Sequence, residues 1–298
     1  MLHATTKIAS PLSRKATLVS LNIKQYSARK LDRRVTKKVN DEHGAAADAS
    51  RVNKLLIEKQ RLEKINSIAS QARTLFYAMT KPWADGIGIL PNLLFAKFAN
   101  EFRVLEREFE FAADQFAAEF PMFVEERKHA LGGLFDPNDY PHPSEIRAKF
   151  KLETKNYPVP DADDFRSDVL DADTIEDIKR EIAETSSTVL HDAMLDTKAQ
   201  LVKVIGHMSE RLAVYSNKEK GERVGAFRDT LVENVRELAE LLPAFNFDND
   251  PAFDALVKRI KSELCVEDAA TLRKHEDVRE AVKKSADDIL KDVESLLG

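Results

Sequence analysis

Residues 92–131 read NLLFAKFANEFRVLEREFEFAADQFAAEFPMFVEERKHAL. Apolar side chains recur there at alternating steps of four and three residues, at Phe98, Phe102, Leu105, Phe109, Ala112 and Phe116. This spacing is that of a heptad seam, which lines the side of a helix that packs on another helix. The stretch therefore predicts one long helix with a phenylalanine core. The alternative is an exposed aromatic groove for a partner, with Phe98, Phe102 and Phe109 as candidate interaction residues.

The residues before this stretch predict the other half of a helical hairpin. Residues 50–79 carry apolar side chains three or four apart, and their alanines are small enough to face the phenylalanines. Between the helices, residues 81–91 read KPWADGIGILP, with a turn signal at Asp85. We expect Trp83 to fill the gap between the helices, and we count Trp83 and Asp85 as candidate interaction residues. The two glycines of this segment lack the third glycine and the strand of a dinucleotide loop, so we expect no cofactor.

The N-terminal part combines a short strand with a basic helix. Residues 18–24 alternate in polarity and predict a strand that pairs with residues 151–157. Ser27 is a suitable N-cap for a helix over residues 28–39. The candidate nucleic-acid contacts are its basic residues Arg29, Lys30, Arg33, Arg34, Lys37 and Lys38. The alternatives are a solvated helix face or a contact with an acidic protein, and no aromatic residues interleave for base stacking.

Composition limits the fold and the charge limits the partners. The chain has 298 residues, of which 9 are glycine and 11 proline, and this low content of turn formers favours long helices. Residues 1–81 carry 17 lysines and arginines against 6 acidic residues, whereas residues 82–298 carry 29 against 45. The two parts could therefore attract each other or bind partners of opposite charge. We expect a cytoplasmic protein that does not contact membranes, because no apolar run is long enough to span a bilayer.

These patterns together predict an all-α fold, an elongated helical hairpin with a C-terminal helical bundle and a small two-stranded β element. Residues 134–172 are rich in proline and form a connector, and Tyr140 within it is a further candidate interaction residue. The predicted parts are a basic arm with a strand and a helix at 1–44, the hairpin at 45–133, the connector at 134–172 and the bundle at 173–298.

No catalytic or metal-binding motif is visible. Cys265 is the only cysteine, which excludes an intramolecular disulfide and a thiolate-rich metal site. Glu126 and His129 have the Glu-x-x-His spacing of a di-metal bundle, but the second pair that such a site needs is missing. We therefore expect no metal and no catalytic residue that can be assigned from sequence.

Several short motifs carry a resemblance to a known family. They are Leu21-Asn22-Ile23 with Ser27-Ala28-Arg29-Lys30, Pro82-Trp83 with Asp85-Gly86 and Ile89-Leu90-Pro91, Leu134-Phe135 with Asp139-Tyr140-Pro141, and Pro158-Val159-Pro160 with Asp164-Phe165-Arg166. Over roughly residues 18–170 the chain resembles a domain of unknown function found in tailed-phage and prophage genomes, with Trp-x-Asp-Gly followed by Leu-Pro as its most specific part. The resemblance implies a mainly helical, intracellular phage-type protein, and it supplies no catalytic residues.

Three functions remain open at this level. The first is a non-enzymatic protein that acts through protein–protein contacts or self-association, in phage assembly or on host machinery such as a ring-shaped ATPase and its partners. The second is an accessory protein that contacts nucleic acid through residues 29–38. The third is a helical enzyme whose site is assembled in space and leaves no motif in the sequence.

Overall fold

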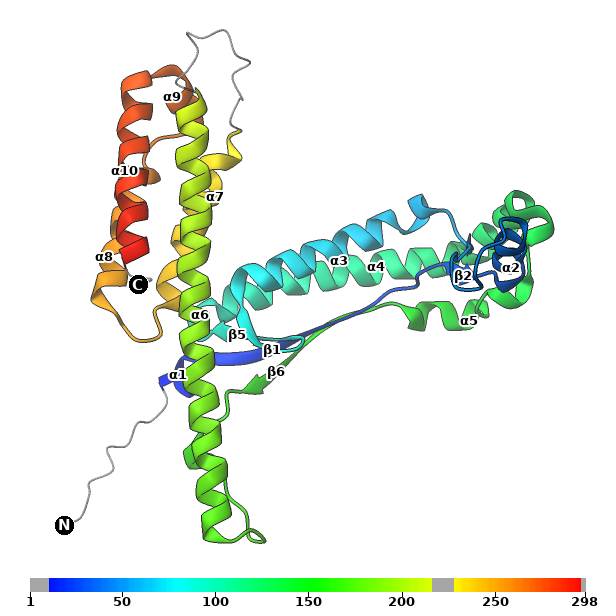
Figure 1. Cartoon of the computed structure of the whole chain (residues 1–298), viewed down its shortest axis with the longest axis horizontal. Coiled ribbons are helices and arrows are strands. Elements are labelled where there is room, and N and C mark those ends of the chain that lie inside the picture. The colour runs from blue at the N-terminus through cyan, green and yellow to red at the C-terminus, as the bar shows by residue number, and fades with distance from the viewer. Residues whose placement is uncertain (1–10, 216–227, 296–298) are drawn as a thin grey trace. The chain divides into compact units, whose positions relative to one another are not determined.

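The computed structural model describes residues 11–215 and 228–295 (Figure 1). The chain divides into two compact units: unit 1 takes its residues from 1–19, 79–96 and 156–298, and unit 2 from 20–78 and 97–155. Residues 1–10 of the expected basic arm lie outside the described residues. The described part is mainly helical, as predicted, but the expected single two-stranded element is wrong. It contains a four-stranded sheet and a separate two-stranded sheet.

The elements have the following bounds. The α-helices are α1 Pro11–Lys15, α2 Arg33–Glu42, α3 Lys59–Met79, α4 Asn92–Leu131, α5 Pro143–Ile146, α6 Ala172–Tyr215, α7 Thr230–Leu241, α8 Pro251–Arg259, α9 Ala269–Lys274 and α10 Glu276–Ser295. The strands are β1 Ala16–Lys24, β2 Arg29–Leu31, β3 Asn53–Leu55, β4 Lys81–Ala84, β5 Ile87–Pro91 and β6 Lys151–Pro158. Short 3-10 or π turns are Gly132–Leu134, Pro137–Asp139, Arg147–Lys149, Ala162–Asp164, Leu242–Phe245 and Ile260–Leu264.

Helices α3 and α4 lie side by side in unit 2 (Figure 1), and α4 covers the predicted range 92–131. The guanidinium of Arg61, near the start of α3, bonds Glu126 near the end of α4 at 3.1 Å, so the two helices run antiparallel. The seam phenylalanines are buried, and α3 contributes the buried Ala69 and Ala72. The predicted phenylalanine core is therefore confirmed.

The four-stranded sheet has the order β4-β5-β1-β6. In this order β6 is the edge strand beside β1, which confirms that residues 18–24 and 151–157 are neighbouring strands. The expectation that residues 81–91 only connect two helices is wrong, because β4 and β5 form an antiparallel hairpin in which Lys81 is opposite Ile89. Its two-residue turn is Asp85-Gly86, and Gly86 has a positive φ of 72°, which glycine adopts without strain.

The basic segment is only partly a helix, so the prediction of a helix over 28–39 is wrong in its first half. Residues 29–31 form β2, which pairs with β3. Ala28 has a φ of 50°, outside the helical region, and its carbonyl accepts a hydrogen bond from the Leu56 N–H at 2.8 Å. Asp32, not Ser27, is the N-cap of α2. Because β3 occupies residues 53–55, α3 begins at Lys59 instead of residue 50.

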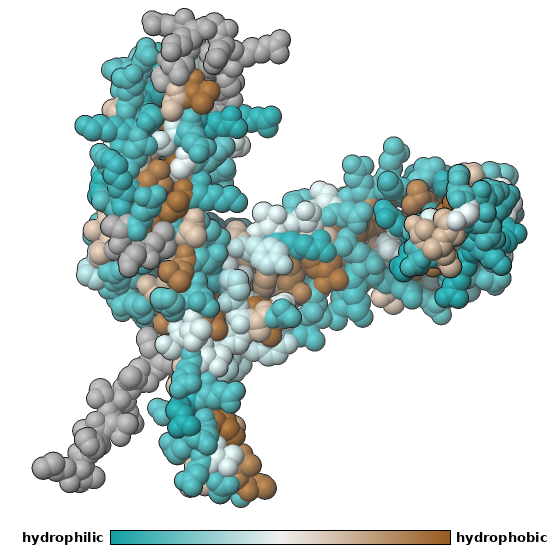
Figure 2. Space-filling model, viewed as in Figure 1, coloured by the Kyte–Doolittle hydropathy of each residue, from teal (hydrophilic) through white to brown (hydrophobic). Residues whose placement is uncertain are grey.

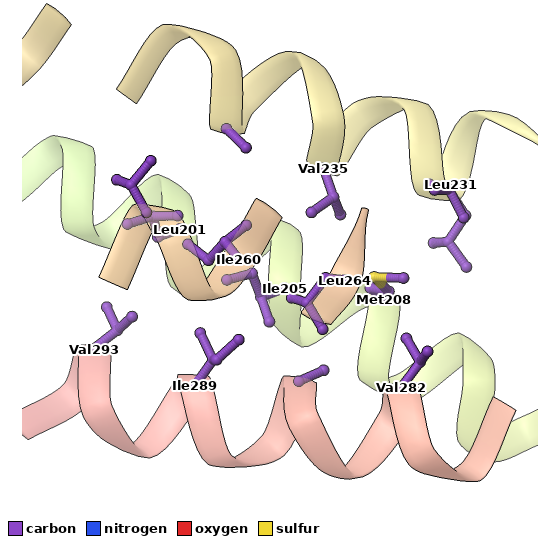
Figure 3. Close-up of a cluster of buried hydrophobic side chains, with 14 of the residues drawn as sticks. Leu201, Ile205, Met208, Leu231, Val235, Ile260, Leu264, Val282, Ile289 and Val293 are labelled. Carbon is purple, nitrogen blue, oxygen red and sulfur yellow. The ribbon is translucent and has the colours of Figure 1, made fainter. Parts of the chain in front are cut away.

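Unit 1 contains the C-terminal helices around one hydrophobic core. Figure 3 shows side chains of α6, α7, the turn 260–264 and α10 pointing toward one another, among them Ile205, Leu264 and Ile289. Helix α8 starts after Asp250, whose carboxylate accepts a hydrogen bond from the Ala252 N–H and so caps the helix.

Candidate functional site

The candidate residues on α4 belong to the core. Phe98, Phe102 and Phe109 are all buried, and the rings of the first two lie 5.8 Å apart between their centres. The exposed aromatic groove that the sequence left open is therefore not formed by these three side chains. Their contribution is the burial of apolar area, which stabilises the helical hairpin.

The remaining aromatic candidates are positioned by different elements. Trp83 lies half-buried in β4, and Asp85 is exposed in the turn that follows. Tyr140 is part of unit 2, where its hydroxyl donates to the Leu56 carbonyl at 3.0 Å. Burial raises the pKa of the Tyr140 hydroxyl. These contacts make Tyr140 an anchor for the segment that follows α4. Trp83 belongs to the other unit, unit 1.

The basic candidates lie on a small folded element, residues 28–57, which we call the clip. Besides the β2–β3 pairing, the Asp32 N–H donates to the Val52 carbonyl at 2.9 Å. The Thr36 hydroxyl donates to the Asp32 carbonyl at 2.7 Å and accepts from the Val52 N–H at 3.0 Å. Asn40, only 3% exposed, donates to the Ala47 carbonyl at 3.0 Å. These bonds fix α2 against the loop and strand that follow it.

Lys54 ties the clip to the segment after α4. Its ammonium is about 10% exposed, pairs with Asp139, lies 3.7 Å from the Asp32 carboxylate and donates to the Leu134 carbonyl at 3.1 Å. The hydrogen bond to Asp139 raises the pKa of Lys54. Sequence reasoning missed this network, because a lone lysine in a predicted helix gives no signal of burial.

All six predicted nucleic-acid residues are exposed on the clip. We call them the basic face: Arg29, Lys30, Arg33, Arg34, Lys37 and Lys38. The first two lie on β2 and the other four on α2, where each of two rows, 33 with 37 and 34 with 38, has the spacing of neighbouring side chains on one helix side. Lys38 makes an exposed pair with Glu42 at 3.7 Å. The other five form no ion pair with any described residue.

The surface around this face is mainly polar. Figure 2 shows a mostly hydrophilic surface with an apolar patch over the end of unit 2 that carries α2, and Leu31 of β2 is exposed. Tyr26, the aromatic residue nearest to it in sequence, packs edge-on against Phe120 with 6.1 Å between the ring centres. Burial raises the pKa of Tyr26 to about 12. The face thus presents positive charge without an exposed aromatic ring from Tyr26.

Other chemistry-bearing residues have structural contacts. Lys81 in β4 is 2% exposed and donates to Asp196 at 2.7 Å and Gln200 at 2.8 Å on α6. Burial lowers the pKa of this lysine. Burial raises the pKa of the Cys265 thiol, which disfavours the reactive thiolate. Within residues 11–215 and 228–295, no group of three His, Cys, Asp or Glu side chains could hold a metal ion.

No helix of the described part is long and apolar enough to cross a membrane. Comparison with models of protein families, with curated proteins and with solved structures gives no match. The assignment of function therefore depends on the residues of the chain itself.

Proposed function

We propose that the protein is a non-enzymatic accessory protein that binds nucleic acid through the basic face. One observation carries this proposal: six exposed cationic side chains lie on one clip, and five of them have no ion-pair partner among the described residues. A surface lysine or arginine that only solubilises a helix commonly has an acidic neighbour three or four residues away. On α2 only Lys38 forms such a pair, with Glu42, whereas Lys37 has Asp41 four residues away and forms no ion pair with it.

The chemistry of the face favours contacts to the phosphate backbone. Arginine and lysine side chains neutralise phosphates and release condensed counterions, which gives binding that depends on salt and little on sequence. The face lacks an exposed Tyr26 ring on which bases could stack, so base readout is not part of the proposal. A helix such as α2 also fits within a nucleic-acid groove or along a single strand.

The test compares two matched double variants in unit 2. Arg34→Gln with Lys38→Gln removes two charges of the basic face, and Arg103→Gln with Arg107→Gln removes two exposed charges with the same spacing on α4. Fluorescence anisotropy with labelled single-stranded and double-stranded DNA and RNA at about 0.15 M ionic strength measures binding.

We expect the wild type and the α4 variant to bind alike and the α2 variant to bind about tenfold or more weakly, because each lost phosphate contact removes a charge-assisted hydrogen bond. Equal binding by all three proteins, or no binding by the wild type to any of the probes, would exclude the proposal.

A second candidate function is self-association, which the sequence leaves open together with protein–protein contacts in phage assembly. One observation favours it: Val169 is 93% exposed and Leu170 is also exposed. They directly precede α6, whose Ile175, Ile178 and Ile182 follow a heptad spacing and are only half-buried. Figure 2 shows apolar surface at the N-terminal end of α6.

Light scattering during size-exclusion chromatography tests this second function. We expect a dimer that Val169→Asp with Leu170→Asp converts into a monomer, whereas Val266→Asp, at another exposed valine, leaves it unchanged. A wild-type monomer at all concentrations used would contradict it.

A further inference from the structure

The clip contains a pocket that shares Arg33 and Lys37 with the basic face and leaves out the other four residues of that face. Its volume is about 460 Å³, and it lies between α2 and the loop that precedes β3. This volume is in the range of pockets that bind small molecules. The lining residues are Leu31, Arg33, Thr36, Lys37, Asn40, Asp41, Ala45, Ala47, Asp48, Ser50 and Arg51.

The charged residues of this pocket are sorted by sign along α2. Arg33 and Lys37 occupy successive turns at its N-terminal end, and Asp41 follows one turn later. Arg51 lies directly before Val52, whose N–H donates to the hydroxyl of Thr36 on α2. At the opposite end, the Asn40 carbonyl accepts from the Ala45 N–H, which brings the loop with Asp48 back toward Asp41.

None of these five charged side chains forms an ion pair with another described residue, although all five line one pocket. The walls are nevertheless fixed, because buried Asn40 bonds the Ala47 carbonyl and the Ser50 hydroxyl. A pocket with fixed walls, three cations and two carboxylates, none of them in an ion pair with a described residue, matches a ligand that carries both an anionic group and hydrogen-bond donors.

We infer that this pocket binds one nucleotide unit with a terminal phosphate. Arg33, Lys37 and Arg51 would hold the phosphate, because guanidinium groups form bidentate hydrogen bonds to phosphate oxygens. Asp41 and Asp48 would accept hydrogen bonds from ribose hydroxyl or base amino groups. The inference rests on the proposed function only in taking the ligand to be a nucleotide. Two sources offer this chemistry, a free nucleotide and the 5′-phosphorylated end of a strand.

Isothermal titration with adenosine monophosphate tests the pocket at about 0.15 M ionic strength. The variants are Arg51→Ala and Asp48→Asn, which change the pocket outside the basic face, and Arg34→Gln with Lys38→Gln, which changes the basic face outside the pocket. Circular dichroism verifies that each variant is folded. Competition by a short strand with a 5′-phosphate, compared with the same strand ending in a 5′-hydroxyl, separates the two sources.

We expect the wild type to bind adenosine monophosphate and Arg51→Ala to bind it about tenfold or more weakly, because a charge-assisted contact to phosphate is lost. Asp48→Asn should weaken binding of adenosine monophosphate but not of inorganic phosphate, which has no sugar or base. Competition only by the 5′-phosphorylated strand assigns the pocket to strand ends, and competition by neither strand assigns it to free nucleotides.

The inference is overturned when adenosine monophosphate at millimolar concentration does not bind the wild type, or when folded Arg51→Ala binds it equally well. Its failure is distinct from failure of the proposed function. Both the proposed function and the nucleotide pocket are supported when Arg34→Gln with Lys38→Gln loses strand binding and still binds adenosine monophosphate as the wild type does. Undiminished strand binding in that variant contradicts the proposal that the basic face binds nucleic acid. The pocket is then judged by the binding of adenosine monophosphate alone.

Discussion

Two lysines show how this protein keeps a positive charge inside the fold. Lys81 of β4 contacts Asp196 and Gln200, and its ammonium lies 5.1 Å from the centre of the Phe245 ring. Lys54 of β3 contacts Asp139 and a backbone carbonyl. Removing an ammonium from water is costly unless an acceptor replaces the water, so each lysine depends on its carboxylate partner.

Asp196→Ala should therefore lower the free energy of unfolding by about 1–2 kcal/mol, because it leaves the buried ammonium of Lys81 without its counter-charge. Lys81→Met should change stability by less than about 1 kcal/mol, since it removes the buried charge and keeps the apolar stem. Urea unfolding measures both. A larger loss in Lys81→Met than in Asp196→Ala would show that the ion pair is a net stabilising contact.

The stability of the clip depends on pH through the carboxyl group of Asp32. The hydrogen bond from the Val35 N–H holds the pKa of its carboxyl below the ordinary value, and Lys54 adds to this effect. The folded protein therefore binds the proton less readily than the unfolded chain. The resulting stabilisation is complete above the ordinary range of aspartate and is lost as the pH falls through the lowered pKa.

Asp32→Asn keeps an N-cap acceptor that does not titrate. We expect the wild type to be more stable than this variant at about pH 7, and the difference between them to shrink at about pH 3. The midpoints of urea unfolding at the two pH values measure this difference in stability. A difference that stays constant would show that the charge of Asp32 does not stabilise the clip.

At the scale of elements, α4 carries its core on one side only. Phe109 is buried, whereas Phe111 on the same helix is 58% exposed. Phe109→Ala should lower the free energy of unfolding by about 3–5 kcal/mol, because it opens a cavity that the surrounding side chains cannot fill. Phe111→Ala removes the same atoms from the surface and should cost less than about 1 kcal/mol. Similar losses in thermal unfolding for the two variants would contradict the assignment of the buried side.

The same elements show how far sequence reasoning reaches. The bounds of α4 follow from its own periodicity, because one uninterrupted seam specifies the helix and its buried side. The clip does not follow from local sequence. Arg29 and Lys30 are good helix formers, but the long-range pairing with β3 places them in a strand. The sequence does not decide whether the six basic residues are exposed. It also does not predict the pocket with Arg51, because that pocket depends on a loop that hydrogen bonds of the Asn40 side chain hold against α2.

Six of the 17 lysines and arginines within residues 1–81 lie together on the basic face, where all six are exposed and five form no ion pair with a described residue. The acidic excess of residues 82–298 supplies no described metal site. This distribution is what a protein needs to attract a polyanion to one surface and to disfavour its binding elsewhere.

The dependence of strand affinity on salt tests this central claim most directly. If the basic face contacts phosphates, the logarithm of the association constant for a single strand falls linearly with the logarithm of salt concentration, by about 0.7 per phosphate neutralised. Arg34→Gln with Lys38→Gln should make that slope shallower by about 1–1.5, whereas Arg103→Gln with Arg107→Gln should leave it unchanged. A slope that is equal in all three proteins would contradict nucleic-acid binding through the basic face.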